Sequence, residues 1–141
     1  MDTTDVSSSE YVNTEVECKI FAVIPRLRRN DPMLTALDTH PFLGGISISV
    51  VKQLADALEK NNTLTTLDLS CTNLGNDGAK HIAEALQANS TLTTLIMRYN
   101  GIDSEGAEYI AMALQANNTL TTLDLSSNDL GAEGAKHIAN K

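Results

Sequence analysis

The sequence predicts an α/β solenoid in which each repeated unit supplies one β-strand and one α-helix. Three observations predict this fold class. A unit of 28 residues recurs, beginning at Leu64, Leu92 and Leu120. The first half of each unit has aliphatic residues at the spacing of a strand, and the second half has them at the spacing of a helix. Because one strand and one helix cannot bury their apolar faces alone, the units must stack on one another.

The strand half of each unit places aliphatic residues at positions one, four and six. These residues are Leu64, Leu67 and Leu69, then Leu92, Leu95 and Met97, then Leu120, Leu123 and Leu125. Successive residues of a strand point to opposite faces of the sheet. The residues at positions four and six are therefore expected to face the core, and those at positions three, five and seven to project from the other face.

The helix half follows a Gly-Ala pair and repeats aliphatic residues three and four positions apart, which is the spacing of one helix face. The members are Ala79, Ile82, Ala83 and Leu86 in one unit and Ala107, Ile110, Ala111 and Leu114 in the next. Asn61, Asn89 and Asn117 follow the helices. Because Asn tolerates left-handed backbone, we expect each of them to end its helix in that conformation.

The chain divides into three regions. Residues 1–13 are polar and acidic and are expected to form a flexible segment. Residues 14–33 carry apolar residues at helical spacing as far as Leu27 and are expected to form an N-terminal capping helix region, in which Pro25 should kink or end the helix. The leucine-containing repeats then occupy residues 34–63, 64–91, 92–119 and 120–141, and the last of them is incomplete.

The repeated pattern Leu-x-x-Leu-x-Leu-x-x-Asn-x-Leu-Gly-x-x-Gly-Ala resembles the ribonuclease-inhibitor-like class of leucine-rich repeats from Leu64 to the C-terminus. The resemblance implies a horseshoe segment with a parallel β-sheet on its concave side and α-helices on its convex side. It also implies that Asn100 and Asn128 hold backbone groups of neighbouring coils; Thr72 takes this position in the first of the three units. Members of the class include nuclease inhibitors, innate immune receptors and bacterial effectors, and all of them bind proteins.

A second resemblance concerns the first repeat. The stretch RLRRNDPMLTALD, followed by a long turn and VVKQLADALEKN, is similar to the first leucine-rich repeat of the tropomodulin family, over about Arg26 to Asn61. Members of that family cap the ends of actin filaments. The resemblance therefore implies actin as an alternative partner, although an Asn-Asp-Pro turn is also a common way into a repeat array.

Charge and hydropathy limit the classes of partner. The formal net charge is −8, and the basic residues cluster only at Arg26, Arg28 and Arg29, so the chain is not expected to bind nucleic acid. The N-terminus lacks the positive start and apolar run of a secretion signal, and no segment approaches the roughly 20 apolar residues of a membrane span. We therefore expect a cytoplasmic protein, in the host cytosol if it is a secreted bacterial effector, and no membrane partner.

Catalytic, metal and cofactor sites find no support in the sequence. Cys18 and Cys71 are far apart and are expected to be reduced thiols rather than a disulfide or metal ligands. His81 and His137 lie two repeats apart, too far to share a metal ion. The sequence therefore predicts a chain that is not an enzyme and needs no cofactor.

The leading hypothesis is a module that binds a partner protein, of unknown identity, through the concave sheet. Position five carries Asp68, Ile96 and Asp124 in successive units. The central unit also places Arg98 and Tyr99 where its neighbours have Ser, or Cys and Ser. An apolar residue beside Arg and Tyr is typical of a binding hot spot. These five residues form the predicted contact surface, with drift among repeats as the alternative explanation.

The C-terminal end gives a third hypothesis. In register with Leu86 and Leu114, the next core leucine would fall one residue beyond Lys141. Either the chain is a piece of a longer array, or another copy covers the end. Because Leu120, Leu123 and Leu125 are then expected on an uncovered strand, we expect self-association into a homo-oligomer through these residues.

Overall fold

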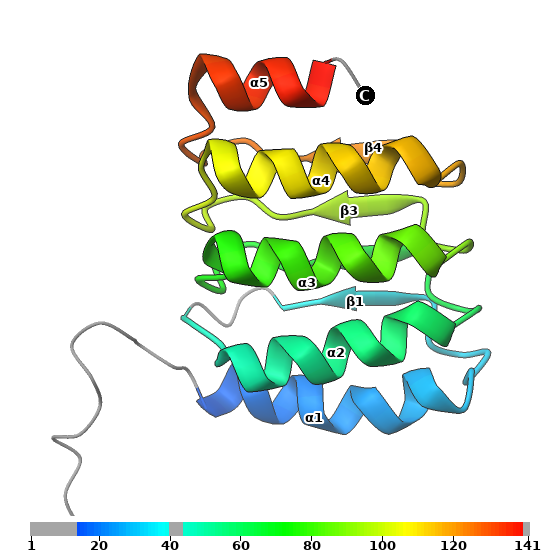
Figure 1. Ribbon diagram of the computed structural model, residues 1–141. Helices are drawn as coiled ribbons and strands as arrows, with labels where there is room; N and C mark the ends of the chain where they lie inside the picture. The colour runs from blue at the N-terminus through cyan, green and yellow to red at the C-terminus, as the bar shows by residue number, and fades with distance from the viewer. Residues whose placement is uncertain (1–13, 40–43, 140–141) are drawn as a thin grey trace, which may run out of the picture.

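The computed structural model describes residues 14–39 and 44–139; the segment 1–13, expected to be flexible, lies outside the described residues. Within these ranges helices and strands alternate along the chain. They are α1 (Thr14–Arg28), β1 (Ala36–Asp38), α2 (Ile48–Lys60), β2 (Thr66–Asp68), α3 (Gly75–Ala88), β3 (Thr94–Ile96), α4 (Ser104–Ala116), β4 (Thr122–Asp124) and α5 (Gly131–Ala139). Figure 1 shows the helices stacked in one layer and the strands in a second layer behind them. The predicted α/β leucine-rich-repeat solenoid is confirmed.

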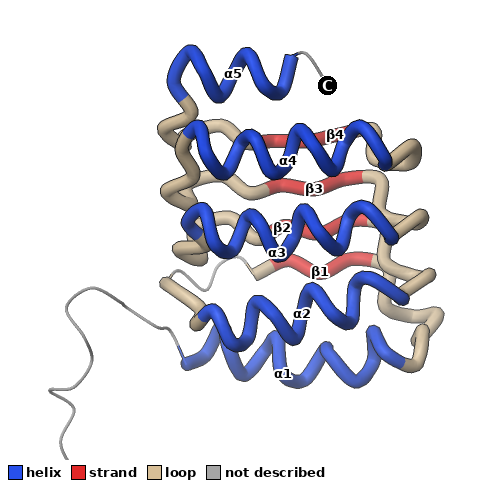
Figure 2. Tube along the Cα trace, in the orientation of Figure 1, coloured by secondary structure: helices blue, strands red, loops and turns tan. Residues whose placement is uncertain are grey.

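The four strands form one parallel sheet in the order β1-β2-β3-β4. The central leucines of the strands pair along the sheet, Leu37 with Leu67, Leu67 with Leu95, and Leu95 with Leu123. Leu67 and Leu95 are fully buried, whereas the residues on either side of them are half-buried. The expected alternation between core and surface is therefore present. Each strand runs into a helix on the same side of the sheet (Figure 2).

The core lies between the sheet and the helices as one continuous cluster of aliphatic side chains. The largest fully buried members are Ile20, Leu27, Leu54, Leu64, Leu67, Leu69, Ile82, Leu92, Leu95, Met97, Ile102 and Ile110. A fully buried aliphatic side chain contributes about 1.5–3 kcal/mol through removal of apolar surface from water. Burial of the repeated leucines is therefore the main source of stability, and it depends on each coil meeting the next.

Asn100 and Asn128 join successive coils on one side of the sheet. The side-chain oxygen of Asn100 accepts from the backbone N–H groups of Thr72 (3.1 Å) and Leu74 (3.0 Å). Its amide nitrogen donates to the carbonyl of Leu69 (2.9 Å). Asn128 makes equivalent bonds to the coil that contains Asn100. The role that the resemblance implied for these two residues is confirmed.

A second row of asparagines joins the coils at the opposite ends of the strands. Asn61, Asn89 and Asn117 follow α2, α3 and α4 with φ of −74°, −78° and −96°, so the expected left-handed backbone is wrong. The extended backbone lets the side-chain oxygen of Asn89 accept from Leu92 N–H at 2.8 Å, while its amide donates to the Leu58 carbonyl at 2.7 Å. The side chain, rather than a left-handed turn, satisfies the groups left open by the helix end.

The first helix covers the N-terminal end of the array. In Figure 1, α1 lies beside α2 at that end. The carboxylate of Glu17 in α1 accepts from the backbone N–H of Ser47, which caps α2. Of the two expected effects of Pro25, a kink or an end of the helix, the structure excludes the second, since the helix continues past Pro25 to Arg28. Pro25 is exposed, and residues four apart share a helix face, so the carbonyl that loses its helical donor lies on the solvent side.

Replacing Asn100 with Ala should lower the free energy of unfolding by about 3 kcal/mol or more. The substitution leaves several buried backbone groups unpaired, at roughly 1–3 kcal/mol each. Unfolding in urea measures this change. Asn62→Ala is the matched control because Asn62 is exposed. Equal unfolding midpoints for the two variants would contradict the role of Asn100 in joining the coils.

Candidate protein-binding face

The outward face of the sheet presents a row of position-five side chains. The strand register places Asp38 beside Asp68, Asp68 beside Ile96, and Ile96 beside Asp124. Neighbouring strands lie about 4.8 Å apart, so adjacent members of this row are in direct reach of one another. Ile96, which is half-buried, therefore lies between two carboxylates, and the predicted residues of this row come together as expected from their register.

Two of these carboxylates are held by the turn that follows their strand. Oδ1 of Asp68 accepts from the backbone N–H of Ser70 at 2.9 Å. Oδ1 of Asp124 accepts from both the backbone N–H (3.0 Å) and the hydroxyl (2.7 Å) of Ser126. The Ser126 hydroxyl is the main cause that holds the pKa of Asp124 below its ordinary value, followed by the Ser126 backbone N–H; the charge of Arg98 adds a smaller contribution.

Arg98 is directed toward the C-terminal side of the face. Its Nε lies 3.8 Å from Oδ2 of Asp124, and about half of its side chain is exposed. Its backbone N–H donates to Oγ of Ser70 at 3.3 Å. An exposed pair at this separation contributes between 0 and about 1 kcal/mol to stability. Arg98 is therefore available to a partner at small cost, and Asp124 is the carboxylate that it engages.

Tyr99 projects from the rim of the face. It has a φ of 54°, and its side chain is 59% exposed. The residues at the same position of the neighbouring repeats, Cys71 and Ser127, have φ values of 62° and 60°. The left-handed backbone, which costs a non-glycine residue roughly 1–2 kcal/mol, is thus a property of the repeat. The exposed ring contributes little to the core, so it is free to contact a partner.

A hollow of about 260 Å³ lies on this face. It is lined by Asp38, Asp68, Ser70, Cys71, Arg98 and Tyr99. Three of the five predicted contact residues therefore meet at one hollow, whereas Ile96 and Asp124 lie in the adjoining row. Asp38, Ser70 and Cys71 were not among the contact residues predicted from the sequence. Their places at positions five, seven and eight of their repeats are the signal that identifies them.

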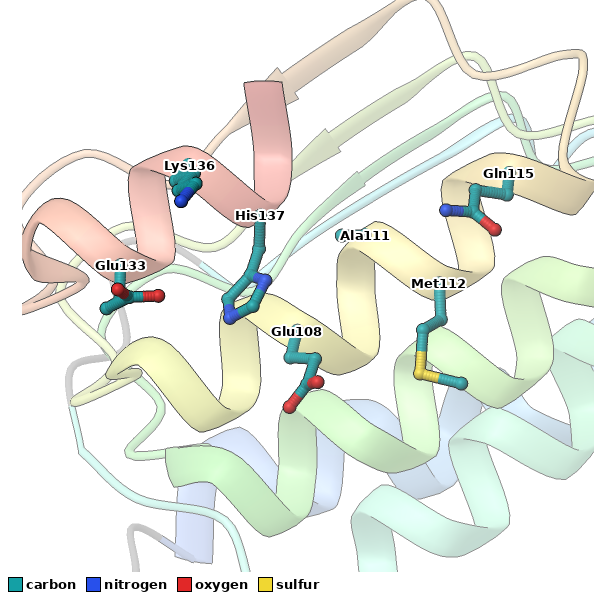
Figure 3. Close-up of a pocket in the computed structure, with 7 residues that line it drawn as sticks. All are labelled: Glu108, Ala111, Met112, Gln115, Glu133, Lys136 and His137. Atoms are coloured by element: carbon teal, nitrogen blue, oxygen red, sulfur yellow. The ribbon is translucent and has the colours of Figure 1, made fainter. Parts of the chain in front are cut away.

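A second hollow lies on the opposite, convex side between α4 and α5 (Figure 3). It has a volume of about 320 Å³ and is lined by Glu108, Ala111, Met112, Gln115, Glu133, Lys136 and His137. In Figure 3 the imidazole of His137 points from α5 toward α4, and the Met112 side chain extends from α4 in the direction away from α5. Among the residues that the structure describes, no three His, Cys, Asp or Glu side chains are placed to hold a metal ion.

The residues predicted to mediate self-association lie in the last repeat. Leu120, Leu123 and Leu125 are only half-buried, although they pack against the core. Their counterparts one repeat earlier, Leu92, Leu95 and Met97, have exposed fractions of 1%, 0% and 0%. The three leucines are thus more exposed than the rest of the repeated core, and self-association through them stays a prediction.

Residues 14–140 match the family model of the TMOD/LMOD leucine-rich domain. This chain belongs to the TMOD/LMOD leucine-rich domain family. Among solved structures it is similar to the actin-binding site 2 of leiomodin-1, with 30% sequence identity and a TM-score of 0.78 over 84% of this chain and 69% of that chain. It also shares its fold with the Caenorhabditis elegans tropomodulin C-terminal domain, at 15% identity and a TM-score of 0.58, over 86% and 89% of the two chains. No curated protein matches it.

The family assignment refines the two resemblances found in the sequence. The similarity to tropomodulin, placed there over Arg26 to Asn61, extends through the TMOD/LMOD match over residues 14–140. The family is TMOD/LMOD rather than that of ribonuclease inhibitors or bacterial effectors. TMOD/LMOD leucine-rich domains are not enzymes, so this chain is a non-catalytic module, as expected. No helix in the described part of the chain has the length and hydropathy needed to cross a bilayer.

Ser126→Ala should raise the pKa of Asp124 toward its ordinary value, and by more than Arg98→Ala does, because the Ser126 hydroxyl is the largest cause of the lowered pKa. A pKa lowered by folding stabilises the folded state above the unfolded pKa, and this contribution is lost as the pH falls through the folded pKa. NMR titration of the Asp124 carboxyl carbon measures both variants. A larger change in Arg98→Ala would show that the ion pair dominates.

Proposed function

We propose that this chain is an actin-binding module that contacts actin through the face formed by Asp68, Ile96, Arg98, Tyr99 and Asp124. The observation that carries the proposal is the similarity to the actin-binding site 2 of leiomodin-1, at 30% identity over 84% of this chain. A cytoplasmic location goes with this proposal because actin filaments lie in the cytoplasm.

The composition of the face supports its role as the contact surface. Arg and Tyr are enriched among the residues that dominate binding energies, and apolar side chains between them exclude water. Here Ile96 supplies the apolar residue, Tyr99 the exposed ring and Arg98 a cation held only by a 3.8 Å pair. The strands and turns that carry these residues are fixed by the asparagine bonds, so little ordering entropy is lost on binding.

The chain should bind actin in co-sedimentation with filaments or in fluorescence anisotropy with labelled monomers. The double variant Arg98→Ala, Tyr99→Ala should bind at least tenfold more weakly with an unchanged urea unfolding midpoint, because about half of the Arg98 side chain and 59% of Tyr99 are exposed. Met112→Ala is the matched control: Met112 is 56% exposed, close to the 59% of Tyr99, but it lies on the convex side.

The outcomes test two claims separately: that actin is the partner, and that the contact lies on the outward face of the sheet. Absence of binding to both forms of actin overturns actin as the partner. Binding that survives the double variant and is lost in Met112→Ala leaves actin as the partner and places the contact on the convex side instead.

A further inference from the structure

The hollow on the outward face of the sheet, lined by Asp38, Asp68, Ser70, Cys71, Arg98 and Tyr99, differs in charge between its two sides. On its C-terminal side, Arg98 engages Asp124. On its N-terminal side the residue at position seven is Ser70, which donates only its backbone N–H to Asp68. No Lys or Arg of the described residues forms an ion pair with Asp68, and the strand register places the second carboxylate, that of Asp38, beside it. The Lys19 ammonium donates to the backbone carbonyl of Asp38, so the carboxylate of Asp68 is the negative charge that this side of the hollow offers to a partner.

Tyr99 lines the same hollow as Asp68 and brings an aromatic ring to it. The ring faces of Tyr side chains attract ammonium and guanidinium groups within about 6 Å of the ring centroid. The chain contains an internal example on the convex side, where Nζ of Lys80 lies 5.5 Å from the centroid of Tyr109. Tyr109 thus has a cation from the chain itself, whereas none of the described Lys or Arg side chains stands over Tyr99. A carboxylate and an exposed ring at one hollow are complementary to a cation.

The size of the hollow limits what can enter. Cavities that hold drug-sized molecules measure about 300–1,000 Å³, and this hollow measures about 260 Å³. Its lining combines the carboxylates of Asp38 and Asp68 with the apolar surface of side chains such as Tyr99. The dimensions suit one side chain that reaches in from a partner, and the net charge of −8 favours approach of a basic surface.

We infer that this hollow receives one lysine or arginine side chain of the partner protein, with the cation held between the carboxylate of Asp68 and the ring of Tyr99. The inference rests on the proposed function insofar as the partner is actin. Arg98 and the hollow then have opposite roles: Arg98 offers a cation outward beside Asp124, and the hollow accepts one. The contact surface therefore offers one positive and one negative group to the partner, and this arrangement fixes how the partner is positioned on it.

The hollow can be tested without actin. The probe is a capped Gly-Gly-Arg-Gly-Gly peptide, and its control has citrulline in place of arginine, which keeps the shape and removes the charge. In NMR titrations of the full chain, we expect saturable shifts of the amides of Asp68, Cys71 and Tyr99 with the arginine peptide, and at least tenfold weaker binding of the citrulline peptide. Shifts of equal size with both peptides overturn the inference.

Variants assign the binding to the carboxylate. Asp68→Asn removes the charge but keeps an oxygen that can accept from the N–H of Ser70, so the turn is preserved. Asp77→Asn is the matched control, since Asp77 is exposed in the first turn of α3, away from the hollow. Asp68→Asn should weaken binding of the arginine peptide at least fivefold and of actin at least tenfold, and Asp77→Asn should change either by less than twofold.

The results distinguish this inference from the proposed function. Wild-type actin affinity in Asp68→Asn, together with unchanged peptide shifts, overturns the hollow as a cation site and leaves actin binding intact. Peptide binding that depends on Asp68 in a chain that does not bind actin supports the hollow and overturns actin as the partner. Equal losses in Asp68→Asn and Asp77→Asn overturn the inference, because net charge alone would then explain them.

Discussion

Hydrogen bonds from asparagine side chains to the backbone of the neighbouring coil set the spacing of this repeat array, and the packing of the buried leucines depends on that spacing. Each strand has only three residues, so the sheet alone supplies few bonds between coils. Asn100 and Asn128 join coils at one end of the strands, and Asn61, Asn89 and Asn117 join them at the other. Because buried backbone groups left unpaired cost roughly 1–3 kcal/mol each, these side chains fix the spacing at which the leucines pack.

The same hydrogen bonds hold the turns of the binding face in place. Asn100 lies directly after Tyr99 and is 1% exposed, so the turn that carries Tyr99 is anchored at its next residue. The exposed residues of the face make few contacts of their own, and the buried ones hold their positions. The scaffold therefore tolerates changes at positions five, seven and eight, and this freedom lets the central repeat carry Ile96, Arg98 and Tyr99 without loss of packing.

The sequence was sufficient to predict the sheet, its register and its two faces, because the positions of Leu67, Leu95 and Leu123 repeat with a constant spacing. The backbone of Asn61, Asn89 and Asn117 was not predicted correctly. An amide can end a helix by adopting left-handed backbone or by bonding with its side chain, and the sequence is the same in both cases. The structure shows the second solution in all three repeats.

Only part of the candidate face was predicted, again because the sequence determines the position of a residue but not the direction of its side chain. Register alone places Asp68, Ile96 and Asp124 in one row, but the direction of a long side chain depends on its rotamer. That Arg98 turns to Asp124 and leaves Asp68 at the hollow could not be read from spacing. Actin was predicted only as an alternative partner because residues such as Leu92 and Asn100 form the scaffold common to leucine-rich repeats. Such residues carry little information about the partner.

A structure of this chain bound to actin, determined by electron cryomicroscopy, tests the central claim most directly. We expect actin to contact Arg98 and Tyr99 on the outward face of the sheet, with a basic side chain of actin at Asp68. A complex in which actin contacts only the convex helices, while Tyr99 and the hollow remain open to solvent, would contradict it.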